Sequence, residues 1–146
     1  MRRYELLGIG VLAVIGCLAV FPATTVQAAA KLGKILIKVG SSEAGGQQVF
    51  DAGLEDTVKD LTRRAGSFVV VDDEASADFR MLVIGREDTP MSGQQTAKRV
   101  TVILSVRDGA SWTPGVKITK VTNAWGLSAL HVIGDAEKWI KANTKK

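Results

Sequence analysis

The most regular apolar pattern in the chain predicts an amphipathic helix that leads directly into a short strand. Its apolar positions recur at i, i+4, i+7 and i+11, which is one face of a helix with about 3.6 residues per turn: Leu54, Val58, Leu61 and Ala65. Asp51 is a candidate N-cap, and Gly66 stands where a left-handed residue would close the helix. The next run, Phe68–Val71, is apolar enough to predict a buried strand. With the earlier apolar run Ile35–Val39, the segment predicts a strand–helix–strand unit.

Three further stretches have strand patterns. Phe79–Gly85 and Lys98–Arg107 alternate between apolar and other residues, and the second predicts a half-buried strand with one lightly covered face. Between them, Arg86–Ala97 is polar, contains proline and glycine, and predicts a long mobile loop. Asp108-Gly109 is a hairpin signal that leads to a last or edge strand, Val116–Val121.

The C-terminal segment predicts a second amphipathic helix. Its apolar stripe recurs with helical spacing: Trp125, Ala129, Val132, Ala136 and Ile140. Asn123 and Ser128 are both candidate N-caps. Leu127 and Leu130 project from the opposite side, which indicates either a later helix start or a partner surface. The order β-α-β-β-β-α predicts an α+β (α/β two-layer) fold, a mixed sheet of about five strands with two helices on one face.

The first residues have the pattern of an export signal. A positively charged start is followed by an apolar run of about 16 residues and by small residues at Val26-Gln27-Ala28, so residues 1–28 are predicted to be a signal peptide. The run is shorter than the roughly 20 residues of a membrane-spanning helix, although a retained anchor is an alternative. The stretch Val14–Cys17 resembles a bacterial lipobox, which gives a second alternative, a lipoprotein anchored through Cys17. Residues 29–146 then form a single domain that is periplasmic or secreted.

Composition narrows the classes of function. The chain has 19 basic and 15 acidic residues among 146, a net charge of +4, with both signs interspersed. It lacks the basic stripe with interleaved aromatic residues that a nucleic-acid surface needs, so we expect no nucleic-acid partner. Cys17 is the single cysteine, so the domain after the leader has no disulfide and depends on packing.

Few residues offer chemistry. His131, the single histidine, lies off the apolar stripe of the last helix, and no Gly-x-Ser-x-Gly elbow supplies a nucleophile. The loop Gly40–Gly46 lacks the lysine that a phosphate-binding loop requires. The acidic cluster Asp72–Asp78 matches no calcium-loop spacing and suits a solvated turn. We therefore expect no enzyme activity, no cofactor and no metal site.

The candidate binding residues lie in two neighbouring parts of the sequence. Trp112 stands beside Pro114 in a turn, where an exposed indole stacks on a sugar or anchors a protein contact, or else folds over the end of the sheet. The Arg86–Ala97 loop begins at Arg86, has Arg99 two residues beyond its end, and is long enough to be functional. We expect Trp112, Arg86 and Arg99 to contribute to one binding surface.

Several segments resemble a family of small exported bacterial proteins without an assigned function. They cover most of the domain: Asp56–Leu61, Val69–Asp72, Ser76–Asp78, a strand ending Gly85-Arg86, and Glu137–Asn143. More distantly, the layout is similar to small envelope assembly domains such as the TolB amino-terminal domain and CsgG-like modules. This chain has no propeller domain, pore-forming segment or convincing lipobox.

The resemblance implies a binding role, because those relatives bind other envelope proteins and do not catalyse. The resulting prediction is a small exported, non-enzymatic binding or assembly module of the bacterial envelope. Its partner would be an envelope protein, with a homodimer as an alternative and a membrane contact only if Cys17 is lipidated. The alternative function is binding of a small ligand or saccharide.

Overall fold

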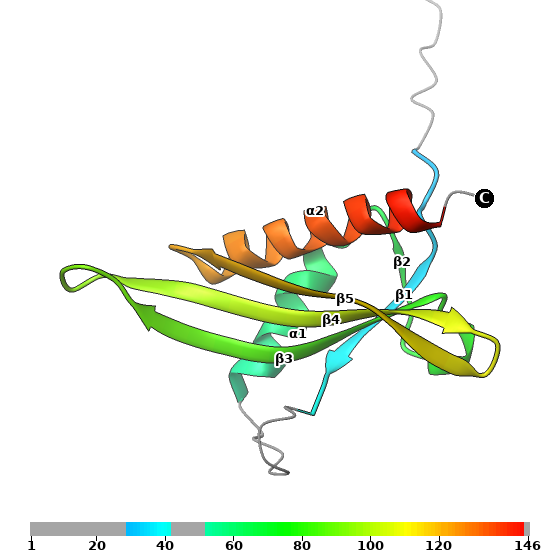
Figure 1. The fold of residues 1–146 in the computed structure, drawn as a ribbon, viewed down its shortest axis with the longest axis horizontal. Helices are drawn as coiled ribbons and strands as arrows, with labels where there is room; N and C mark the ends of the chain where they lie inside the picture. The colour runs from blue at the N-terminus through cyan, green and yellow to red at the C-terminus, as the bar shows by residue number, and fades with distance from the viewer. Residues whose placement is uncertain (1–28, 42–51, 145–146) are drawn as a thin grey trace, which may run out of the picture.

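The computed structural model describes residues 29–41 and 52–144, and these form one mixed sheet with two helices (Figure 1). The elements are β1 (Lys34–Val39), α1 (Ala52–Arg64), β2 (Val69–Val70), the 3-10 helix η1 (Glu74–Ser76), β3 (Phe79–Pro90), β4 (Thr96–Asp108), β5 (Ser111–Thr122) and α2 (Trp125–Asn143). The predicted leader, the candidate cap Asp51 and most of the Gly40–Gly46 loop lie outside the described residues.

The sheet combines a parallel and an antiparallel part. Its strand order is β2-β1-β3-β4-β5, in which β1 pairs in parallel with β2 and β3. The strands β3, β4 and β5 then form an antiparallel meander, with Gly109 at a φ of 61° in the predicted Asp108-Gly109 turn. The predicted α+β class, a mixed five-stranded sheet with two helices, is confirmed.

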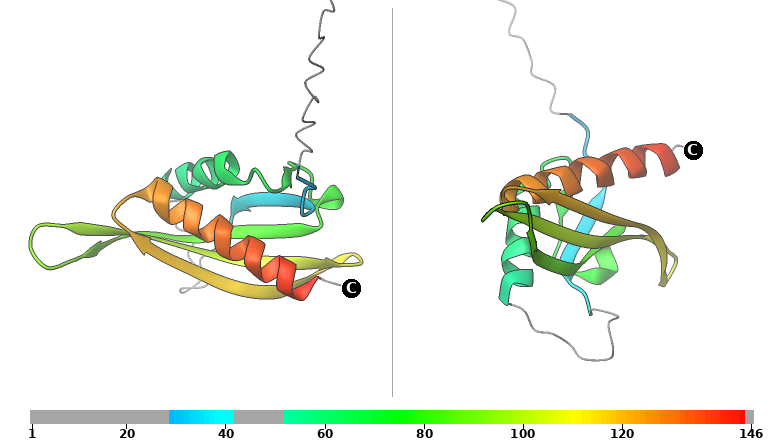
Figure 2. Two further views of the ribbon diagram at one scale, coloured as in Figure 1. Left: turned by 90° about the horizontal axis from the view of Figure 1, so that it is seen from above. Right: turned by 60° about the vertical axis from the view of Figure 1, so that its left-hand side comes forward.

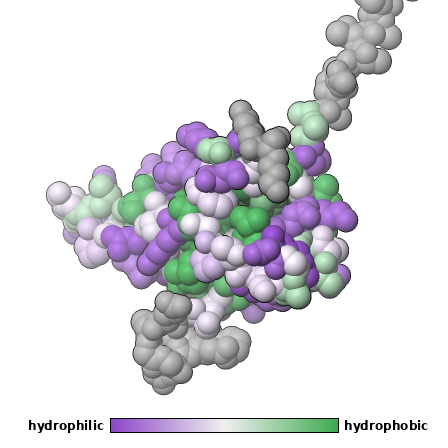
Figure 3. Space-filling view, turned by 45° about the vertical axis from the view of Figure 1, so that its right-hand side comes forward, coloured by the Kyte–Doolittle hydropathy of each residue, from purple (hydrophilic) through white to green (hydrophobic). Residues whose placement is uncertain are grey.

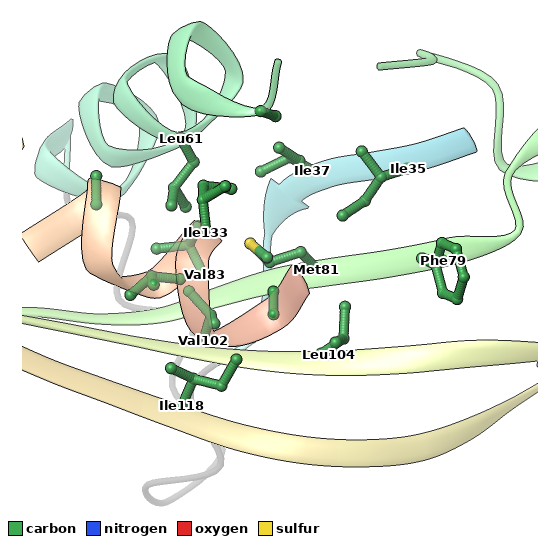
Figure 4. Close-up of a cluster of buried hydrophobic side chains, with 14 of the residues drawn as sticks. Ile35, Ile37, Leu61, Phe79, Met81, Val83, Val102, Leu104, Ile118 and Ile133 are labelled. Atoms are coloured by element: carbon green, nitrogen blue, oxygen red, sulfur yellow. The ribbon is translucent and has the colours of Figure 1, made fainter. Parts of the chain in front are cut away.

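Both helices pack on one face of the sheet, where alternate strand residues form the core (Figure 4). Leu61 of α1 and Ile133 of α2 meet Met81 from the central strand, and all three are at most 2% exposed. The opposite face carries no α-helix in the described part of the chain, and Leu82 and Ile103 are half-buried there. The lightly covered face predicted from the alternation in β4 is therefore present.

The end of the first helical unit differs from the prediction in two ways. The strand β2 is two residues long and lies at an edge of the sheet, so Val69 and Val70 are 44% and 37% exposed while Phe68 alone turns into the core. Gly66 is not in the left-handed region. The chain instead turns after α1 with the Phe68 N–H donating to the Ala65 carbonyl at 2.9 Å.

The segment Arg86–Ala97 is not a loop, which corrects the sequence prediction. The strands β3 and β4 continue through it, with paired residues from Gly85↔Thr101 to Pro90↔Thr96. The resulting ribbon projects past the helices and the rest of the sheet (Figure 2). We call this projection, residues 85–101, the arm. Ala97 and Val100 are buried at its base, and the polar composition of the remainder reflects exposure of the ribbon, not absence of strand pairing.

The start of α2 also differs from the prediction, because neither Asn123 nor Ser128 caps it. Ala124 is the N-cap residue, and its N–H donates to Thr122 Oγ1 at 3.2 Å. Ser128 is buried, and its hydroxyl donates to the Lys98 carbonyl at 2.7 Å. The helix therefore begins before Leu127, which remains 39% exposed.

Two glycines test this packing. A Cβ at Gly115 would lie 3.0 Å from the Leu104 carbonyl and 2.6 Å from the Trp139 ring, whereas a Cβ at Gly134 in α2 would meet nothing within 4 Å. We expect Gly115→Ala to lower the free energy of unfolding by about 1–3 kcal/mol. Gly134→Ala should raise it by about 0.5–1 kcal/mol through helix propensity. Urea denaturation of both variants measures this, and equal effects would contradict the packing described.

Candidate functional site

The arm is a closed ribbon that is two-stranded beyond Lys98, while at its base β5 also pairs with Lys98–Thr101. At its tip the Met91 N–H donates to the Gln95 carbonyl at 3.0 Å, and Gly93 takes a φ of 82°. Met91 is 55% exposed. Figure 3 shows the arm standing out from the body, with hydrophilic side chains along it. The arm therefore presents one exposed methionine at the tip of a polar ribbon.

A β-bulge at the base of the arm turns Arg86 toward the helices. The register of β3 against β4 shifts between Val83 and Gly85, so side chains beyond the bulge change face. Arg86 then donates to the Gly53 carbonyl at 2.9 Å and to Thr57 Oγ1 at 3.3 Å. These contacts fasten β3 of the arm to the first turns of α1.

Trp125, the first residue of α2, joins the two strands of the arm. The Arg86 guanidinium lies 4.2 Å from the centre of its ring, and the Lys98 ammonium lies 5.3 Å from it. Both distances are within the range of cation–π attraction. Lys98 also forms an ion pair with Asp88 across the arm. The base of the arm is thus held by α1, α2 and the pairing between its own strands.

Arg99 points to the other face of the arm. Its guanidinium lies 3.3 Å from Glu87, and the two side chains are 40% and 61% exposed. A pair this exposed contributes little to stability, about 0–1 kcal/mol. Arg86 and Arg99 therefore do not share one face, although both lie on the arm.

Trp112 lies at the opposite end of the sheet, which corrects the predicted single surface. It pairs with Arg107, eight residues along β4 from Arg99, which corresponds to about 26 Å at the usual rise of a strand. The structure therefore brings Trp112 together with neither Arg86 nor Arg99.

A polar cluster surrounds Trp112 on the open face of the sheet. The indole N–H donates to Glu74 at 2.8 Å, and the Arg80 and Arg107 guanidinium groups lie 4.7 Å and 5.1 Å from the ring centre. Glu74 also accepts hydrogen bonds from Arg80 at 2.9 Å and from Lys38 at 3.0 Å. We call these five residues the Glu74 cluster.

The Glu74 cluster fastens η1 to the sheet. Arg107 donates to the main-chain carbonyl of Glu74, and Glu74 contacts side chains from three strands. Of these five residues, sequence reasoning gave Trp112 alone as a binding residue. It placed Glu74 in a solvated acidic turn and assigned no role to Lys38, Arg80 or Arg107. Strand alternation places Arg80 on the open face, but nothing in the sequence pairs it with Glu74.

The other candidate residues have local roles or none. Asp73 accepts the Ala75 N–H at 3.1 Å, and Asp78 accepts the Lys34 N–H at 2.8 Å. His131 is exposed on α2. Among the described residues, no group of three or more His, Cys, Asp and Glu is placed to hold a metal ion.

A groove lies between β5 and the C-terminal half of α2. Its volume is about 480 Å³. One wall comes from the stretch Val116–Thr119, and the other includes Trp139 and Ala142. Its floor is therefore partly apolar, and its long side follows an edge strand.

Two solved structures are similar to this chain. The hypothetical protein CT253 from Chlamydia trachomatis aligns with a TM-score of 0.52 and 12% identity, over 78% of this chain and 100% of that one. A PelC dodecamer from Paraburkholderia phytofirmans aligns with a TM-score of 0.44 and 13% identity, over 79% and 92% of the two chains. No family model and no curated protein matches the sequence.

The similarity to the Chlamydia protein shows the fold alone, because the identity is low. It is compatible with the small-protein family that the sequence resembles. Within the described ranges, neither helix is long and apolar enough to cross a membrane.

The Glu74 cluster predicts a specific pH dependence. The hydrogen bond from Lys38, followed by that from Arg80, holds the pKa of the Glu74 carboxyl below its usual value of 4.5. A carboxyl with a lowered pKa stabilises the fold above its unfolded-state value, and this contribution is lost as the pH falls through the folded-state pKa. Glu74→Gln should therefore lower the Tm at pH 7 and have a smaller effect below pH 4.5.

The measurement is the Tm of the wild type and the variant across this pH range. Glu55→Gln, which removes an exposed acid from α1, is the matched control and should change the Tm little at pH 7. A Glu74→Gln effect that stays constant down to pH 3, about 1.5 units below the usual glutamate value, would contradict the role assigned to the carboxylate.

Proposed function

We propose that this domain is a non-enzymatic binding module of the bacterial envelope, and that it contacts another protein through the arm. One observation carries the proposal: β3 and β4 continue as a paired ribbon beyond the helices (Figure 1). Met91, at the tip of this ribbon, is exposed. A ribbon that adds little to the core is more readily explained by a contact outside the domain.

The contacts at the base of the arm support this role, because they restrict movement of the arm relative to the helices. Arg86 is held by two acceptors on α1 and by the Trp125 ring, and Lys98 is paired to Asp88. A surface that is ordered before binding loses less conformational entropy when it binds. The arm therefore suits a contact that must form at low entropic cost.

A non-enzymatic role is supported by the use of the acidic residues. Glu74 binds Lys38, Arg80 and Trp112, while Asp73 and Asp78 accept main-chain N–H groups. A catalytic acid or base must be within reach of a substrate proton, and these carboxylates are directed at their own chain.

Site-specific photo-crosslinking in intact envelopes tests the proposal. A photoreactive residue in place of Ser92, at the arm tip, should give a discrete adduct with another envelope protein. The same residue at Thr62, on the exposed side of α1, is the control and should give no such adduct. The full chain is expressed with its own leader. Equal labelling at the two positions, or none at Ser92, would contradict a docking role for the arm.

Saccharide binding at the Glu74 cluster is the second candidate function. It is favoured by the Arg80 and Arg107 guanidinium groups beside the Trp112 ring and by Arg80 Nε, which is buried with no hydrogen-bond partner among the described residues. It is less favoured than the arm because two guanidinium groups already approach the indole ring.

A thermal-shift series separates the two functions, because a ligand that binds the folded state raises the Tm. For the saccharide function, an oligomer of a uronic acid should raise the Tm, a neutral glucose oligomer should not, and Arg107→Ala should abolish the shift. The absence of any shift with the uronic acid oligomer would remove this candidate and leave the arm proposal intact.

A further inference from the structure

The outer edge of β5 has no strand partner among the described residues, and it lies next to the groove beside α2. In the described part of the chain, β5 is the last strand of the sheet and pairs with β4. An unpaired strand edge is a template for another strand. The far end of this edge lies beside the base of the arm, where Thr119–Thr122 pair with Lys98–Thr101. The inference below concerns the outer side of β5 and goes beyond the proposed function.

The register determines which residues of β5 face outward. Residues of an antiparallel strand bond alternately to its two neighbours. The Arg107 N–H donates to the Asp78 carbonyl, so odd-numbered residues of β4 bond toward β3 and even-numbered ones toward β5. Even-numbered residues of β4 pair with even-numbered residues of β5 beyond its bulge. Lys117, Thr119 and Val121 therefore direct their N–H and C=O groups to the free edge.

The N-terminal end of this edge is closed. The register shifts next to Leu104, which leaves Gly115 as an extra residue, and Pro114 has no N–H to donate. Strand pairing can therefore extend from Val116 to Thr122, a length of about 23 Å. This length fits a segment of about seven residues.

The groove is placed to receive the side chains on one face of a strand that pairs with the β5 edge. It lies on the helix side of the edge, where Val116 and Ile118 face Trp139 and Ala142. The Gly115 backbone lies directly beneath the Trp139 ring, which keeps the indole at the closed end of the groove. Alternate side chains of an added strand would enter this groove, and its lining favours apolar ones.

The charges beside the edge are mainly positive. Lys117 is exposed on the opposite face of the sheet, and Lys138 is 83% exposed at the rim of the groove. Asp135 is the shared partner of Lys120, at 2.5 Å, and of Lys138, at 3.7 Å, so one carboxylate faces two lysines here. A segment with acidic residues would complement Lys117 and Lys138, whereas two β5 edges brought together would place lysines against each other. The charges therefore favour a different polypeptide over a second copy of this chain.

We propose that β5 accepts an extended acidic segment of another polypeptide as an additional strand. Main-chain hydrogen bonds to Lys117, Thr119 and Val121 hold the segment. Its apolar side chains enter the groove beside Trp139, and its acidic side chains lie on the face of Lys117. This is recognition by strand addition, in which the backbone gives affinity and alternate side chains give specificity.

A defined peptide tests the proposal without knowledge of the natural partner. The probe is a fluorescein-labelled heptapeptide of alternating glutamate and valine, and its anisotropy is measured with the full chain. We expect saturable binding. A peptide with N-methyl groups on alternate residues, on the side facing the edge, should bind at least about tenfold more weakly because it lacks the N–H donors. This control leaves the protein unchanged.

Charge and position are tested separately. A peptide of alternating lysine and valine should not bind, and Lys117→Glu should weaken binding of the acidic peptide by about fivefold or more. Lys59→Glu on α1 is the matched control and should leave binding unchanged. Equal binding of the N-methylated peptide, or no anisotropy change at about 1 mM protein, would overturn the proposal. A dimer of this chain that excludes the peptide would overturn it in favour of a second copy.

Discussion

The bulge between Val83 and Gly85 is the constraint on which the arm depends. Before the bulge, the odd-numbered residues of β3 face the helices; after it, the even-numbered residues do so. This change brings Arg86 over Trp125 and within hydrogen-bonding distance of Thr57. Without the extra residue, Arg86 would face the open side of the sheet and the arm would lose its attachment to α1. The one extra residue in β3 thus allows the arm to contact both helices.

The Glu74 cluster performs the corresponding task at the other end of the sheet. The connection between β2 and β3 has no buried residue within η1, so apolar packing of η1 itself does not hold it in place. Hydrogen bonds and ion pairs from Lys38, Arg80 and Arg107 do so instead. Each of these pairs is partly exposed and individually weak, but they converge on one residue and act as a network. Contacts of arginine and lysine side chains therefore hold the segments at the two ends of the sheet in place, while apolar packing holds the helices against its middle.

Much of the fold was predictable because its long elements have regular apolar patterns. The stripe of α1 and the alternation in β4 depend on burial against one face, which a single sequence records directly. The arm was not predictable in this way, since its strands are exposed and their pairing continues from the register of the buried part. The environment of Trp112 was missed for a related reason. Its partner Glu74 is 38 residues away in sequence, and local periodicity carries no information on such contacts.

The two edges of the sheet differ in a way that bears on how the domain meets other molecules. At one edge, β2 is only two residues long, which leaves little backbone for a further strand to pair with. At the other edge, β5 is 12 residues long, and Pro114 and the bulge interrupt only its first part. A protein that had to prevent all edge pairing would also be expected to interrupt the remainder, between Val116 and Thr122. The lysines along that stretch discourage self-association while leaving the backbone accessible. The β5 edge is therefore selective, because the lysines disfavour a second copy and the backbone accepts a segment of opposite charge.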